Sequence, residues 1–430
     1  MTIIVDTSFV KVYDIVAKSA ISYDIKYVIF STNTATSLIA QIIMLFYLNK
    51  FYREERFKNL SANFKKYSYL AMFVVLLNSA LLSYTSAQLF QQHLYSKYIL
   101  VYSIILCYIS SGIFLAVLGA KFLSWYRRNH SYLILLYFVS VALIVFNILT
   151  SMLITIVKLE DKSDQIREYI GITSFPDSPK YNVLELINKI SLIMTFVSLW
   201  ITTFVLVTSY RKKSLRNFLF LMILILPLSY FFINFVIQYY VFDVFNYFHM
   251  VSPVVISIVL VAVFSLSNPI GGITFGILFW RTSKAISYEK DIVGFVLISG
   301  YGIMMIFMSN QVTSLSITPY PPFGLTTISL LPLSSYLMLV GIYNATKLVS
   351  SNRELRRSII RIAKESTILN QMGEAENQKE VEFVISKIHE DSIVTNLETD
   401  IKHGADLDEN ELRKYIEEVV KELHTENPNA

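Results

Sequence analysis

Residues 292–346 read IVGFVLISGYGIMMIFMSNQVTSLSITPYPPFGLTTISLLPLSSYLMLVGIYNAT and contain no Lys, Arg, Asp or Glu. About 20 apolar residues carry a helix across the roughly 30 Å hydrocarbon layer of a bilayer, so this run is long enough to cross twice. Within it, the motif PYPPFG at 319–324 removes amide donors and disfavours helix. The run therefore predicts two spans, one ending near Gln311 and the next starting near Phe323.

Seven further runs without charged residues precede this one. They cover residues 27–49, 67–96, 98–120, 129–157, 190–210, 217–242 and 244–280. The whole chain is 54% hydrophobic and only 16% charged, which is too apolar for a soluble domain of this size. We predict an all-α, polytopic transmembrane helix bundle of about nine spans over residues 27–347, with the lipid bilayer as its solvent.

The basic residues predict the orientation of the bundle. Lys and Arg follow the first, third, fifth, seventh and ninth spans, whereas the other turns carry almost none. Positive residues near span ends stay in the cytoplasm, so we expect a multi-pass plasma-membrane protein with its N-terminus outside and its C-terminus inside. Residues 1–26 are then an extracytoplasmic amphipathic segment, and residues 158–189 are an outer loop.

The charge is divided unevenly along the chain. Residues 351–430 hold 11 basic and 18 acidic residues, net −7, whereas residues 1–350 hold 26 and 14, net +12. Because the positive excess flanks membrane spans, it predicts no nucleic-acid partner. Residues 348–430 change to charged, helix-forming sequence and are predicted to be a helical cytoplasmic tail.

Two amphipathic stretches are expected in this tail. The first has apolar residues at helical spacing up to Met372. The second begins where Asp408 and Glu411 form a capping pattern. Its apolar face is predicted to pack on the first stretch, on its copy in a homodimer or on a cytoplasmic protein, and comprises Leu412, Tyr415, Ile416, Val419, Val420 and Leu423.

Sequence motifs give no support for an enzyme. The chain has no glycine-rich phosphate loop, HExxH or GxSxG pattern, and His389-Glu390 lacks the residues that follow it in histidine kinases. Its single cysteine, Cys107, falls inside a span and excludes an intrachain disulfide or a multi-cysteine metal site. We therefore expect no catalytic residues and no cofactor.

Two places are candidate ligand or gating sites. The motif NPIGG, with Asn268, Pro269, Gly271 and Gly272, interrupts the long run 244–280. Either the span ends near Ser267 and residues 273–280 form an interfacial helix, or the helix is broken at membrane depth, as in transporters. Asp243 and His249 lie at the outer mouth between spans 6 and 7, where they form a pH-sensitive pair or an ordinary loop contact.

Several short motifs resemble one known group of proteins. They are SNQ at 309–311, PYPPFG at 319–324, LSSY at 333–336, VGIY at 340–343 and LRRSI at 355–359. Together they are similar to a multi-pass membrane family of ammonia-oxidising archaea, over spans 7 to 9 and the first tail stretch. That family has no assigned activity, so the resemblance implies an archaeal plasma-membrane location and no catalytic residues.

Three functions are compatible with this sequence. A receptor-like sensor that signals through its tail is favoured, because charge-poor spans can repack and an amphipathic tail gives that change something to move. A small-molecule transporter using a broken helix at 268–272 is the alternative. A scaffold or accessory subunit of a membrane complex is the third.

Overall fold

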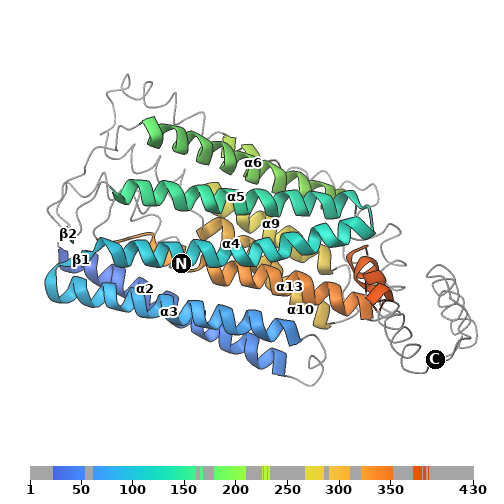
Figure 1. Cartoon of the computed structure of the whole chain (residues 1–430), viewed down its shortest axis with the longest axis horizontal. Helices are drawn as coiled ribbons and strands as arrows, with labels where there is room; N and C mark the ends of the chain where they lie inside the picture. The colour runs from blue at the N-terminus through green and yellow to red at the C-terminus, as the bar shows by residue number, and fades with distance from the viewer. Residues whose placement is uncertain are drawn as a thin grey trace, which may run out of the picture.

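The structure is a computed structural model. It describes residues 23–53, 62–160, 165–167, 179–209, 225, 227–229, 231–232, 267–284, 290–309, 321–351, 371–379, 381–383 and 386. The long helices are α2 (Tyr23–Arg53), α3 (Ala62–Gln92), α4 (Lys97–Arg128), α5 (Tyr132–Glu160), α6 (Pro179–Ser209), α9 (Ser267–Lys284), α10 (Lys290–Ser309) and α13 (Leu331–Ser351). They lie side by side in one bundle (Figure 1).

Seven stretches among the described residues are long and apolar enough to cross a membrane. They lie in α2, α3, α4, α5, α6 and α10 and in Leu325–Ser350, which contains α13 except for its last residue. The protein is therefore an all-α, membrane-embedded helix bundle. These stretches correspond to predicted spans 1 to 5, 8 and 9. Most of span 6 and the first part of span 7 lie outside the described residues, so the total of nine stays a prediction.

Contacts and short links show how neighbouring helices run relative to one another. Ser111 of α4 hydrogen-bonds Ser335 of α13, and further along both helices Trp125 stacks on Tyr343, so α4 and α13 run parallel. Short links join α2 to α3, α4 to α5 and α9 to α10, and the members of each pair run in opposite directions (Figure 1). The C-terminal ends of α2, α4 and α13, where basic residues follow, thus share one end of the bundle. The side of the membrane that this end faces stays a prediction.

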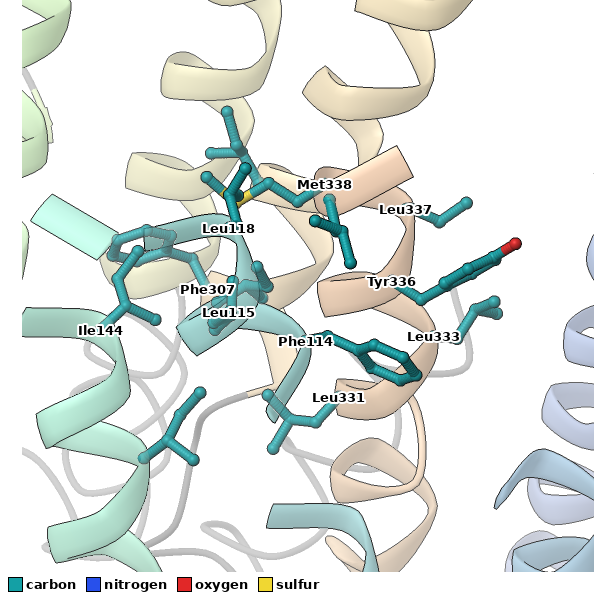
Figure 2. Packing of buried hydrophobic residues seen from close by; sticks show 14 of the residues in the cluster. Phe114, Leu115, Leu118, Ile144, Phe307, Leu331, Leu333, Tyr336, Leu337 and Met338 are labelled. Carbon is teal, nitrogen blue, oxygen red and sulfur yellow. The ribbon is translucent and has the colours of Figure 1, made fainter. Parts of the chain in front are cut away.

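Helix α13 occupies the centre of the bundle. Every residue from 321 to 346 is buried. Figure 2 shows Leu115 of α4 and Phe307 of α10 in one buried cluster with Met338 of α13. Small residues permit this close packing. A Cβ atom added at Gly302 of α10 would lie 2.6 Å from the backbone nitrogen of Met338 in α13.

The last span is broken near its start. A short helix, α12 (Leu325–Ile328), precedes α13, and Ser329 and Leu330 form the turn between them. Pro332 has no amide hydrogen, so it cannot donate to the Ile328 carbonyl and the helix is interrupted there. The sequence predicted one span from near Phe323 onwards and missed this interruption.

A small two-stranded sheet lies at the other end of the bundle. Strand β1 (Leu94–Ser96), between α3 and α4, pairs antiparallel with β2 (Gln165–Arg167) from the predicted outer loop. Helix α6 also begins earlier than the predicted span at residue 190. Lys189 and Glu185 form an ion pair of 3.0 Å at i, i+4 spacing. Pairs at this spacing stabilise a helix, so charged residues are compatible with this additional helical stretch.

Candidate functional site

A helix from the tail packs against the end of the bundle. Residues 371–379, here called the tail helix, contact the C-terminal end of α13 and the α4–α5 turn. Met372 and Ala375 are buried, and the Thr346 hydroxyl donates to the Met372 sulfur at 3.5 Å. Gly373 permits a close approach, because a Cβ atom there would lie 2.6 Å from Val349. The apolar face of the tail helix is thus part of the hydrophobic core of the bundle.

The tail helix brings one carboxylate into this contact. Glu376 is only 4% exposed, and the Trp125 indole nitrogen donates to its Oε2 at 2.8 Å. The Lys379 ammonium lies 3.8 Å from the other carboxylate oxygen. Burial of a carboxylate is costly unless hydrogen bonds and opposite charges compensate it. The indole of α4 provides part of that compensation only while the tail helix is docked.

Further polar contacts surround the docked helix. The Asn129 side chain donates to the Gln371 carbonyl at 3.2 Å, and the Ser131 hydroxyl donates to the Gln371 side chain. Beyond the helix, Arg128 and Glu382 form an ion pair of 3.0 Å. Because Glu382 is half exposed in this pair, solvent weakens the interaction. Specific hydrogen bonds therefore fix the position of the helix, and the outer ion pair adds less.

A second polar region lies between α2 and α12. The hydroxyls of Thr34 and Thr326 are 3.0 Å apart, and the Gln41 amide donates to the Ser329 hydroxyl at 3.0 Å. The Ser329 hydroxyl itself donates to the Thr326 carbonyl. Gln41 Oε1 and Asn33 Nδ2 are buried and have no hydrogen-bond partner among the described residues. Neutral oxygens and amides thus collect beside the interruption between α12 and α13.

The motif at 268–272 was predicted to interrupt a helix, but it is itself helical and forms the first turns of α9, which runs from Ser267 to Lys284. Gly271 packs directly on the Phe196 ring, and a Cβ atom at Gly272 would lie 2.6 Å from Phe307. These glycines therefore permit close packing between helices. Helix α9 lies antiparallel along α10, because Gly272 approaches Phe307 and Gly276, further along α9, approaches the earlier Gly300 carbonyl. A ligand or gating role for these residues stays a prediction.

The other predicted site residues cannot be placed. Asp243 and His249 lie outside the described residues. So do the tail interaction residues Leu412, Ile416, Val419 and Leu423. The pH-sensitive pair and the second amphipathic stretch of the tail stay predictions.

Sequence reasoning missed the pairing of Trp125 with Glu376. A tryptophan at the end of a span ordinarily indicates an anchor at the membrane interface, where this residue type is enriched. Glu376 follows Met372 by four residues, which puts both on one face of a helix. An acidic residue on an otherwise apolar face was the available signal, and the partner on α4 was not readable from the sequence.

In the part of the chain that the structure describes, no group of three or more His, Cys, Asp or Glu side chains could hold a metal ion. The single cysteine, Cys107, is buried and free. No protein-family model, curated protein or solved structure matches this chain. The resemblance to the family of ammonia-oxidising archaea therefore stays a prediction.

Proposed function

We propose that this protein is a receptor-like membrane sensor whose tail helix docks reversibly on the bundle. The observation that carries the proposal is the buried Glu376 carboxylate, which accepts a hydrogen bond from Trp125 of α4. When the helix leaves, water replaces the Trp125 indole as the hydrogen-bond donor to this carboxylate, so undocking does not leave the buried charge without compensation. A plasma-membrane location and a cytoplasmic tail belong to the same proposal.

The position of α13 supports coupling between the two ends of the bundle. At one end, α12 and the turn that leads into α13 contact Thr34 and Gln41 of α2. At the other end, α13 contacts the tail helix through Thr346 and Val349. A small shift of this central helix would change both contacts, since packed helices respond by moving as units. A ligand or membrane signal that moves α2 would then release the tail helix for a cytoplasmic partner.

A distance measurement between two spin labels tests this proposal. Cysteines replace the exposed His130, in the α4–α5 turn, and the exposed Gln378 of the tail helix in a Cys107→Ser background. We expect a short docked distance and a longer undocked distance, with Glu376→Ala shifting the population to the longer one. In cells, the same variant should change which proteins crosslink to the tail. A single short distance unaffected by Glu376→Ala would refute reversible docking and favour a scaffold.

A transporter is a second candidate, because neutral oxygens surround the interruption between α12 and α13. Transporters hold substrates and ions at such interruptions, where backbone groups lie free of the helix ladder. A permeation pathway would bring water to Ser329, so Ser329→Cys should react with a water-soluble thiol reagent in a Cys107→Ser background. The matched control is Ser335→Cys, at a buried position bonded to Ser111. Equal protection of both cysteines would exclude this pathway.

A further inference from the structure

Two lysines of the bundle and one of the tail helix lie together where the tail helix is docked. Lys121 is the first charged residue after the run 98–120, and Lys347 is the first after the run 292–346. Both therefore belong at the edge of the hydrocarbon layer, where lipid phosphates lie. In the structure the Lys121 ammonium lies 4.9 Å from the centre of the Tyr343 ring. Tyr343 lies one helical turn before Lys347 on α13, so Lys121 and Lys347 are at the same level of the bundle.

The tail helix supplies the third lysine and the nearest carboxylate. Lys379 lies 3.8 Å from Glu376, which also accepts the Trp125 indole hydrogen bond. Lys347 and Lys379 both repel Lys121, and among the described residues Glu376 provides the one attractive carboxylate acting on it. Three lysines and one carboxylate leave a net charge of +2 in this cluster. The docked state therefore keeps a positive charge that an anion would neutralise.

We propose that Lys121, Lys347 and Lys379 bind a phosphate group, supplied by an anionic lipid headgroup or by a free phosphate. Multiple ammonium groups suit the several oxygens of a phosphate. Trp125 and Tyr343 beside the cluster are the residue types enriched at the headgroup level. Two of the lysines belong to the bundle and one to the tail helix, so the bound phosphate stabilises the docked state. This inference rests on the proposed reversible docking and names what regulates it.

The experiment uses full-length protein in nanodiscs and the fluorescence of Trp125 in a Trp200→Phe, Trp280→Phe background. On heating, the emission should shift to longer wavelength when the tail helix leaves the indole. The undocking temperature is measured first in zwitterionic phosphatidylcholine. It is then measured with increasing phosphatidylglycerol in one series, and with inorganic phosphate against chloride of equal ionic strength in another.

We expect at least one anion to raise the undocking temperature. Lys121→Gln, Lys347→Gln or Lys379→Gln should each raise the anion concentration needed by about fivefold, which is the affinity equivalent of one lysine near an anionic surface. Lys66→Gln is the matched control, because Lys66 is an exposed lysine at the same end of the bundle and outside the cluster. A response to phosphatidylglycerol alone assigns the site to a lipid headgroup, and a response to both anions extends it to free phosphate.

Two results would overturn the phosphate site. One is the absence of a response to either anion, and the other is an equal response in wild type and in the three lysine variants. If Lys121→Gln or Lys347→Gln fails to fold, Lys379→Gln still tests the site, because Lys379 belongs to the tail helix and its replacement leaves the sequence of the bundle unchanged. The undocking transition in phosphatidylcholine alone reports reversible docking, so loss of the anion response with that transition intact refutes the phosphate site only.

Discussion

Among single residues, Glu376 has the largest expected effect on the docked tail. Glu376→Ala removes the charged acceptor of the Trp125 indole, and hydrogen bonds to charged groups contribute about 1.5–3 kcal/mol. We therefore predict that the docked state loses roughly this free energy. Hydrogen–deuterium exchange of residues 371–379 measures it as a loss of protection, with exchange in α4 and α13 unchanged.

The control for this prediction is Glu382→Ala. Glu382 pairs with Arg128 in a half-exposed position, where ion pairs contribute about 0.2–1 kcal/mol. Protection of the tail helix should therefore fall less than in Glu376→Ala. If both variants lost the same protection, the buried carboxylate would have no special part in docking.

Gly302 is a second residue with a sharp expectation, because it permits the contact between α10 and α13. A Cβ atom at Gly302 would lie 2.6 Å from the Met338 nitrogen and 2.9 Å from the Ser334 carbonyl oxygen, both backbone atoms. Since backbone cannot move aside cheaply, Gly302→Ala should destabilise the bundle by about 1–3 kcal/mol. Thermal unfolding in detergent measures the change.

Gly112 of α4 is the matched control for Gly302. A Cβ atom at Gly112 would meet nothing within 4 Å. Gly112→Ala should therefore stabilise the helix by roughly 0.5–1 kcal/mol, as expected for alanine in a helix interior. A loss of stability in Gly112→Ala as large as in Gly302→Ala would contradict the close-packing explanation.

At the scale of helices, sequence predicted the spans better than their interruptions. The motif PYPPFG correctly separated the last two spans. The interruption after Ile328 was missed, although Pro332 lies four residues on and cannot donate to its carbonyl. Proline early in a helix is also compatible with an ordinary start, so the sequence alone did not distinguish the two cases.

The contact between α2 and α12 gives a prediction for a helix pair. Gln41→Leu removes the hydrogen bond to Ser329 and also removes the buried Oε1 without a partner. Because Ser329 keeps its bond to the Thr326 carbonyl, stability should fall by only about 0.6–1.7 kcal/mol, the range for hydrogen bonds between membrane helices. Chemical unfolding of the purified protein measures this loss.

Thr36→Val is the control for the α2 contact. Thr36 lies on the exposed face of α2, and its hydroxyl donates only to the Thr32 carbonyl of the same helix among the bonds described. Its replacement should leave stability within about 0.5 kcal/mol of wild type. A similar loss in both variants would show that Gln41 has no particular role in joining α2 to α12.

For the whole molecule, hydropathy predicted which segments are spans but not which one is central. The apolar runs look alike in composition, yet α13 is buried all round whereas α2 and α3 are largely exposed. Lipid is as apolar as the side chains, so helix packing in a membrane depends on shape and small residues rather than on hydrophobicity. Gly302 permits the close packing of α10 on α13, and the Ser111–Ser335 hydrogen bond joins α4 to α13. The sequence does not show which residues of other helices these residues contact.

The orientation of the molecule is the broadest prediction. His93 lies exposed in the turn between α3 and α4, and His130 lies exposed between α4 and α5, so α4 separates them. The basic ends of α2, α4 and α13 share the end at which His130 lies, and positive residues favour the cytoplasm. In a Cys107→Ser background, His93→Cys should therefore react with an impermeant maleimide in intact cells.

His130→Cys should react only after the membrane is permeabilised, because α4 carries the chain across the bilayer between the two positions. Each variant is the other's control, since both sites are exposed histidines in turns at opposite ends of α4. Labelling of His130→Cys alone in intact cells would show the opposite orientation, with the tail helix outside the cell. Labelling of both would show that α4 does not separate two compartments, and the predicted span there would be wrong.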